Sequence, residues 1–116
     1  MMMMMVETFK ADIFIGLQEG YCGLIHQDIE VFMTCMNYCD EVKLGVTFTK
    51  TEFIYVNGNE PGVIIGLINY PRFPDTNQNI KDKAFELAKK LMVELNQNRC
   101  SVVCSDKTYM FENELI

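Results

Sequence analysis

Apolar and polar positions alternate along residues 9–17 (FKADIFIGL), which is the period of a β-strand. Two more stretches rich in Thr, Val, Ile and aromatic residues follow, VTFTKTEFIYV at residues 46–56 and GVIIGLINY at residues 62–70. Such residues favour strands, so the pattern predicts three strands before the middle of the chain. Gly20 and Gly23 indicate a loop after the first of them.

The second and third predicted strands form a hairpin, because Asn57-Gly58-Asn59-Glu60 between them is a strong turn signal. With Gly58-Asn59 as the two-residue loop, Tyr55 lies opposite Gly62, Phe53 opposite Ile64 and Thr51 opposite Gly66. One face then collects apolar residues that helices should cover: Val46, Phe48, Ile54, Val56, Val63, Ile65 and Leu67. The opposite face collects three Thr with Phe53, Tyr55, Gly62, Ile64, Gly66, Ile68 and Tyr70. Interior strand glycines often mark the close approach of a ligand or another backbone, so we expect this second face to be open and functional.

Helical spacing of apolar residues predicts helices at residues 26–42 and 80–97, the second capped by Asn79. The second helix has one stripe: Ile80, Ala84, Leu87, Ala88, Leu91 and Leu95. The first has two stripes, one of Ile29, Phe32, Met33, Met36 and Cys39, the other of Val31, Cys35, Tyr38 and Val42. A helix that is apolar on two sides buries two sides, and we expect its second stripe to contact another subunit.

Short strands at residues 100–104 and 108–111 complete the pattern. The order strand, helix, two strands, helix, two strands predicts a single domain over residues 1–116. The expected fold is an α+β, ferredoxin-like sandwich with an antiparallel-rich sheet of about five strands and two helices on one face. Residues 1–8, which include a run of five Met, are expected to be a disordered N-terminus.

Composition narrows the possible partners. Ten Lys and Arg stand against 16 Asp and Glu, a net charge of -6, so binding to a nucleic acid polymer is not expected. No apolar run is long enough for a membrane span. Five Cys, an odd number, favour free thiols in the cytoplasm. The pairs Cys35/Cys39 and Cys100/Cys104 could hold zinc geometrically, but their spacing fits buried core thiols better.

The sequence offers little for catalysis. A Cys22–His26 nucleophile pair is conceivable, but a polar residue at a helix start is the better interpretation of His26. There is no G-x-S-x-G, P-loop or G-x-G-x-x-G motif. We therefore expect no enzyme: no catalytic residue, metal or cofactor. An enzyme that uses Cys22 or His26 remains a third possibility behind the two described below.

Two arginines are candidates for ligand binding. Arg72 lies among aromatic residues and prolines, and Arg99 precedes a predicted strand. Guanidinium groups bind phosphate at two points, and aromatic rings stack on bases, so a small phosphorylated nucleotide fits this combination. Alternatively, Arg72 caps nearby carbonyls while Tyr70 and Phe73 anchor a loop.

Three stretches, IFIGLQEGYCG, FIYVNGNEPGVIIGLINYPRFP and LNQNRCSVVCSDKTYMFE, resemble the phage anti-Thoeris sponges. The resemblance covers residues 12–112 and implies a phage anti-defence protein in the host bacterial cytoplasm. Such a protein sequesters a cyclic ADP-ribose-type signal from TIR-domain enzymes without degrading it, and acts as a homo-oligomer with pockets near subunit contacts. Our own candidate ligand-binding residues are Arg72, Arg99, Tyr21, Phe53, Tyr55, Asn69, Tyr70 and Phe73. The alternative function is an acidic protein-interaction inhibitor of a host defence protein, with no small-molecule ligand.

Overall fold

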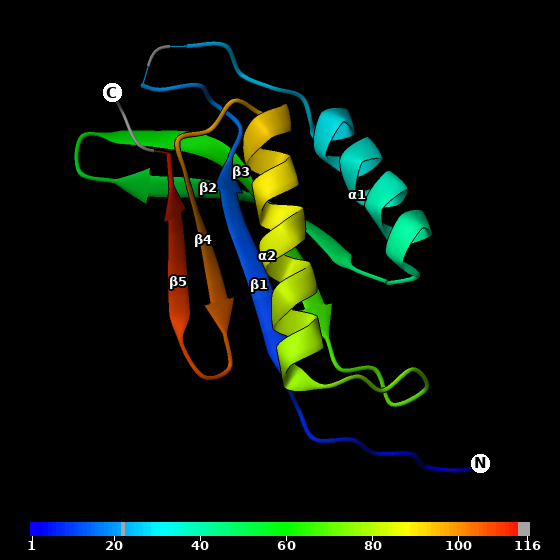
Figure 1. Cartoon of the computed structure of the whole chain (residues 1–116). Coiled ribbons are helices and arrows are strands. Elements are labelled where there is room, and N and C mark those ends of the chain that lie inside the picture. The colour runs from blue at the N-terminus through cyan, green and yellow to red at the C-terminus, as the bar shows by residue number, and fades with distance from the viewer. Residues whose placement is uncertain (22, 114–116) are drawn as a thin grey trace.

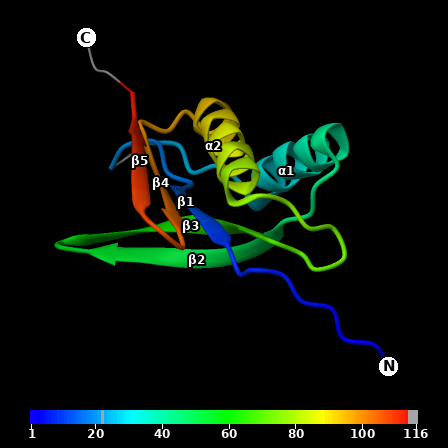
Figure 2. The same cartoon turned by 60° about the horizontal axis from the view of Figure 1, so that its bottom comes forward.

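The computed structural model of the chain describes residues 1–21 and 23–113. Its strands form one sheet in the order β2-β3-β1-β4-β5, with every neighbouring pair antiparallel. The elements are β1 (Lys10–Gly16), α1 (Asp28–Val42), β2 (Thr47–Tyr55), β3 (Gly58–Ile68), α2 (Asn77–Glu94), β4 (Arg99–Cys104) and β5 (Thr108–Glu112). Both helices lie on the same side of the sheet (Figures 1 and 2). The predicted ferredoxin-like α+β sandwich is confirmed, and β5 is its additional edge strand.

The core lies between the sheet and α2. Alternate residues of β1, Ala11, Ile13 and Ile15, are almost completely buried. The single apolar stripe of α2 packs against them, and Leu87 and Leu91 have no exposed surface. This is the face on which the sequence pattern placed the helices.

The two apolar stripes of α1 face the opposite way from the expected one: the stripe expected to contact another subunit is the one buried in the core. Val31, Cys35 and Tyr38 are buried against the rest of the domain, and the hydroxyl of Tyr38 donates to the carbonyl of Lys83 on α2 at 3.3 Å. The outward-facing stripe contains Ile29, Phe32, Met33 and Met36, each about half exposed. Both stripes are apolar enough to be buried, so only the neighbouring helix decides which one faces inward.

The predicted register of the β2–β3 hairpin is wrong. The turn is Val56-Asn57, so Tyr55 pairs with Gly58, Phe53 with Glu60, and Thr51 with Gly62. Asn57 itself takes the positive φ of 62°, which leaves Gly58 free to pair in the strand. Every predicted partner moves by four residues. Because this number is even, each side chain stays on the face that the sequence assigned to it.

In this register the β2–β3 hairpin extends past the end of β1, the next strand of the sheet. β3 pairs with β1 only from Gly62 onwards, so the tip of the hairpin extends beyond the other strands (Figure 1). Ile54 and Val56, which we expected helices to cover, are more than four-fifths exposed at this tip.

Helix and strand ends also differ from the expectations. α1 begins at Asp28, and Thr76 rather than Asn79 caps α2, accepting a hydrogen bond from the Asn79 N–H at 3.1 Å. β3 ends at Ile68, so Tyr70 lies in the following loop. Residues 1–9 form no helix or strand. Phe9 is nevertheless buried in the core, and the chain before residue 7 leads away from the domain (Figure 2).

Candidate functional site

A polar hollow lies at the upper end of the sheet in Figure 1, where β1 and β5 end and β4 begins. Its volume is about 470 Å³. Four segments line it: the end of β1 with the loop after it, the β2–β3 hairpin, the start of β4 with the residues before it, and the end of β5 with the residue after it. The lining residues are Gly16, Gln18, Gly20, Tyr21, Phe53, Glu60, Gln97, Asn98, Arg99, Glu112 and Asn113.

Glu60 supplies the hollow with a negative charge. Its carboxylate lies over Gly16 of β1, so close that a Cβ at residue 16 would be 2.8 Å from Oε2. Burial raises the pKa of Glu60, and nearby Glu52 raises it further, while a hydrogen bond from the backbone of Gln18 lowers it. Glu60 forms no ion pair within residues 1–21 and 23–113. This carboxylate is therefore available to a cationic group of a ligand.

Phe53 forms an aromatic wall beside Glu60. Its ring lies 6.4 Å from that of Phe14 and packs down onto Gly62, where an added Cβ would be 2.1 Å from Cε2. Only glycine at residue 62 leaves room for this ring position. Tyr21 is more than four-fifths exposed at the rim. A flat ring or a cation of a ligand can contact these aromatic faces.

The other polar residues that line the hollow carry almost no net charge together. Arg99 pairs with Glu112 across β4 and β5. Gln97 donates from Nε2 to the Gln18 carbonyl at 3.0 Å. After the Arg99–Glu112 pair is discounted, Glu60 leaves the hollow with an excess negative charge, which suits a polar ligand that carries a positive charge.

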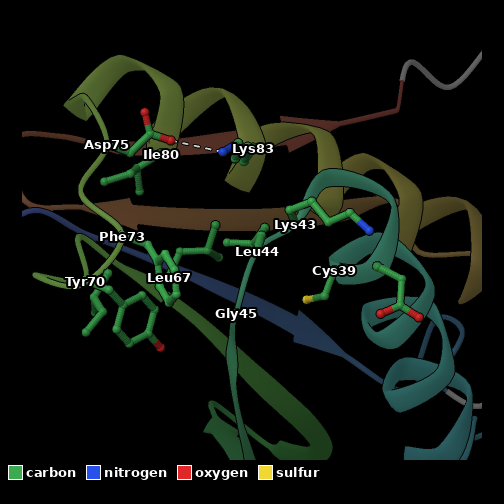
Figure 3. A pocket seen from close by; sticks show the side chains of 12 residues that line it. Cys39, Lys43, Leu44, Gly45, Leu67, Tyr70, Phe73, Asp75, Ile80 and Lys83 are labelled. Atoms are coloured by element: carbon green, nitrogen blue, oxygen red, sulfur yellow. Dashed lines mark hydrogen bonds and ion pairs between the residues drawn. The ribbon is translucent and has the colours of Figure 1, made fainter.

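A second, apolar hollow of about 560 Å³ lies at the other end of the sheet, between the end of α1 and the loop that follows β3 (Figure 3). Leu44, Leu67 and Ile80 line it, with Tyr70 and Phe73 along one side. Its charged residues include Asp75 and Lys83, which pair with each other at 3.0 Å. Most of the surface of this hollow is apolar, and no side-chain amide lines it to orient a polar ligand.

The structure divides the predicted ligand-binding residues between these two hollows. Tyr21, Phe53 and Arg99 line the polar hollow, and Tyr70 and Phe73 line the apolar one. The other three line neither hollow: Tyr55, Asn69 and Arg72.

These three side chains have local contacts instead. The Tyr55 ring lies against Gly58 within the hairpin. Asn69 donates to the Glu7 carbonyl and accepts from the Asp75 N–H, both at 2.9 Å. The Arg72 guanidinium lies over the Phe73 ring at 5.6 Å. Arg72 and Arg99 therefore do not share a hollow within one chain, because their segments lie at opposite ends of the sheet.

Sequence reasoning missed Glu60 and the polar residues at residues 97–98 and 112–113. Glu60 was placed in the turn, where a charged residue is unremarkable. The signal that could have found it is the alternation of the hairpin itself. Glu60 has the same parity as Gly62, and therefore lies on the open face next to Phe53.

The described residues include no group of three or more His, Cys, Asp or Glu that could hold a metal ion. Cys35, Cys39, Cys100 and Cys104 are free thiols, and burial raises the pKa of Cys35 and Cys100 to about 12. Such thiols are protonated and unreactive at neutral pH. Cys22, the other half of the possible Cys22–His26 pair, lies outside the described residues. Among the described helices, none is long and apolar enough to cross a membrane.

Comparisons with known proteins give matches only at the level of structure. No protein-family model and no curated protein matches the sequence. A phage SAM lyase in complex with S-methyl-5'-thioadenosine matches with a TM-score of 0.81, covering 100% of this chain and 98% of that chain at 19% identity. A phage SAM lyase in the apo state matches with a TM-score of 0.78, covering 93% and 91% at 20% identity. At these identities the likeness shows a shared fold.

These matches correct three expectations. The anti-Thoeris sponge interpretation is wrong, because the structural neighbours are phage SAM lyases rather than sponges. The expectation that the chain is no enzyme is contradicted in the same way, because both neighbours are enzymes. The alternative, an acidic protein-interaction inhibitor, finds no support in them either.

Proposed function

We propose that this chain is an enzyme of the SAM lyase type, which cleaves S-adenosylmethionine and releases S-methyl-5'-thioadenosine. The observation that carries the proposal is the match over the whole chain to a phage SAM lyase that holds S-methyl-5'-thioadenosine. A small nucleoside-derived molecule is therefore the proposed partner. The polar hollow is the proposed site.

The chemistry of the hollow supports this ligand. S-adenosylmethionine has an adenosine portion, a sulfonium and an amino acid end, so it needs polar partners, an aromatic surface and a negative charge. Gln18, Gln97 and Asn98 offer amides for the adenosine, and Phe53 offers a ring face. Glu60 offers the free carboxylate. The apolar hollow also has aromatic rings and carboxylates, but no side-chain amide lines it, and its Asp75 is paired with Lys83.

The bond that must break joins the sulfonium sulfur to the γ-carbon of the methionine portion. The electron pair of this bond stays on sulfur, which becomes the neutral thioether of S-methyl-5'-thioadenosine. Without water, the amino acid fragment either closes onto its own carboxylate or loses a proton. The sulfonium charge disappears during this step, so a carboxylate held against sulfur would stabilise the substrate more than the transition state. We therefore assign Glu60 to the ammonium group, whose charge does not change.

The test is incubation of the purified protein with S-adenosylmethionine, followed by mass spectrometry of the products. We expect S-methyl-5'-thioadenosine to accumulate with time. We expect Glu60→Gln to lower kcat/KM by about ten- to a hundred-fold, because it removes one charged hydrogen bond. The matched control is Glu52→Gln, an exposed carboxylate of the same hairpin on the opposite face. Glu52 acts on the site only through its charge effect on Glu60, so this variant should change the rate far less than Glu60→Gln does.

S-adenosylmethionine that stays intact at an equimolar concentration of a folded protein would refute the lyase proposal. Equal decreases of kcat/KM in Glu60→Gln and Glu52→Gln would refute the assignment of Glu60 but would not refute the lyase activity.

We also propose that the protein forms a homo-oligomer. The exposed apolar stripe of α1 supports this, because four large apolar side chains share one face. Met36→Glu should lower the mass measured by light scattering if this stripe forms the contact. The proposed location is the host bacterial cytoplasm, which the four free thiols among the described residues support.

A further inference from the structure

His26, the only histidine of the chain, is buried between two carboxylates. Its Nε2 lies 2.6 Å from Oε2 of Glu19, and its Nδ1 lies 2.9 Å from Oε1 of Glu30. Glu19 belongs to the loop between β1 and α1, and Glu30 to the first turn of α1. Both ring nitrogens are therefore engaged by negatively charged acceptors.

The second oxygen of each carboxylate is also engaged. Oε2 of Glu30 accepts from the Gln27 N–H at 2.8 Å, at the start of α1. Oε1 of Glu19 accepts from Nδ2 of Asn96 at 2.7 Å, just after α2. The imidazole thus joins the loop to the beginning of one helix and the end of the other.

The loop held in this way forms a wall of the polar hollow. Gln18, Gly20 and Tyr21 line that hollow, and Glu19 lies between the first two in sequence. Two backbone hydrogen bonds join the two ends of this loop, from the His26 N–H to the Leu17 carbonyl at 2.8 Å and from the Glu19 N–H to the Leu24 carbonyl at 2.9 Å. The position of Tyr21 therefore depends on the contacts of Glu19.

Two carboxylate acceptors require two N–H donors, and only the protonated imidazole has both. A neutral ring would present a lone pair to one of the carboxylates. The hydrogen bond to Glu30 is the largest cause that raises the pKa of His26 above its ordinary 6.5, and burial opposes it in part. Glu19 and Glu30 are the charged groups that act on the ring, while α2 contributes the uncharged Asn96, through Glu19.

We propose that His26 is a positioning residue of the candidate site, whose protonated ring holds residues 17–21 against both helices and so makes ligand binding at the polar hollow depend on pH. When the ring loses its proton, one carboxylate contact becomes repulsive and the loop loosens. The identity of the ligand rests on the proposed function, but the latch itself does not.

The latch is tested first without any ligand. The ring C–H signals of His26 are unique in a proton NMR spectrum, so their titration gives the pKa of this residue directly. We expect a midpoint above 6.5, and a lower midpoint in Glu19→Gln and in Glu30→Gln. The ¹H–¹⁵N heteronuclear NOE of the Gly20 and Tyr21 amides should fall as pH rises through that midpoint. A midpoint at or below 6.5, or NOE values that do not change with pH, would overturn the latch.

The second measurement is calorimetric titration with S-methyl-5'-thioadenosine between pH 5.5 and 9. This compound carries no charge in that range, so the charge of Glu60 has little effect on its binding. We expect the affinity to fall by about five-fold or more through the midpoint of His26. In His26→Gln the affinity should be low and independent of pH. The matched control, Asp75→Asn, removes an ion pair at the other end of the sheet and should keep the wild-type profile.

The two proposals fail in different ways. No binding at any pH, together with a pH-dependent loop, would reject the ligand and keep the latch. Binding that is equally strong at all pH values in the wild type would reject the latch as a positioning device, even if the ligand binds.

Discussion

Gly62 is the residue at which a single methyl group tests the geometry of the site. In Gly62→Ala, the new Cβ would lie 2.1 Å from Cε2 and 2.7 Å from Cδ2 of Phe53, and 2.9 Å from the Ile15 carbonyl oxygen. Nonbonded carbon atoms prefer about 3.5–4.0 Å, so the ring must move by roughly 1.5 Å, whereas the backbone of β1 must move only by tenths of an ångström. The phenyl ring is therefore displaced from the wall of the hollow.

The expected change in stability follows from two opposing effects. Overpacking of this kind destabilises by about 1–3 kcal/mol. Alanine gains about 0.5–1 kcal/mol over glycine within a strand, because it loses less backbone entropy on folding. The steric effect is the larger, so we expect a net loss of about 0.5–2 kcal/mol, with Tm falling by roughly 4 °C for each kcal/mol.

The assay combines urea unfolding with calorimetric titration of S-methyl-5'-thioadenosine. Gly62→Ala should weaken binding by about five- to a hundred-fold, because the stacking surface moves. In Gly62→Ala/Phe53→Ala the ring is absent and only the contact with the Ile15 carbonyl oxygen remains. Adding Gly62→Ala to Phe53→Ala should therefore cost less stability than adding it to the wild type, while binding stays weak.

Gly45→Ala is the matched control, because its new Cβ would meet only Tyr70, at 3.9 Å. It should be neutral, or stabilised by up to about 1 kcal/mol through the unfolded state. A Gly62→Ala protein as stable as Gly45→Ala, with unchanged affinity, would refute the position of the ring.

Three other predictions concern the fold. Leu87→Ala should cost about 2–5 kcal/mol in urea unfolding, since the side chain has no exposed surface, and a smaller loss would mean that the core can collapse around the gap. Val31→Glu should prevent folding, as judged by circular dichroism, whereas Met33→Glu on the same helix should not, because only Val31 is buried. The pKa of His26 is raised in the folded state, so its stabilising contribution is complete below pH 6.5 and is lost as pH rises through the folded-state pKa. The stability difference between the wild type and His26→Gln should therefore shrink from pH 6 to pH 9, and a difference that grows over this range would reverse the assigned sign.

The fold was predictable from the sequence because its elements follow local patterns. Alternation in residues 9–17 specifies a strand with one buried face, and the single stripe of α2 specifies its orientation. The order of these elements leaves few topologies once crossovers must be right-handed. The confirmed sheet with two helices on one face follows from these constraints alone.

The candidate site was only partly predictable. Tyr21, Phe53 and Arg99 were named from the sequence and line one hollow, but Arg72 was given the central role and lies elsewhere. Glu60 was missed because the turn was placed two residues too late, which put it outside the paired strand. Residue type suggested a phosphate ligand, whereas the pairing of Arg99 with Glu112 leaves the hollow with excess negative charge.

The sequence by itself determined which residues form strands and helices and which face each strand residue occupies, because both depend on periodicity over a few positions. Only the tertiary structure decided the hairpin register, the inward stripe of α1 and the assembly of the polar hollow. Each of these depends on contacts between segments far apart in the chain. A shift of four residues preserves the alternation of a strand, and two apolar stripes of similar character differ only in what packs against them. Local sequence carries no information on these choices, so the packing of the whole domain makes them.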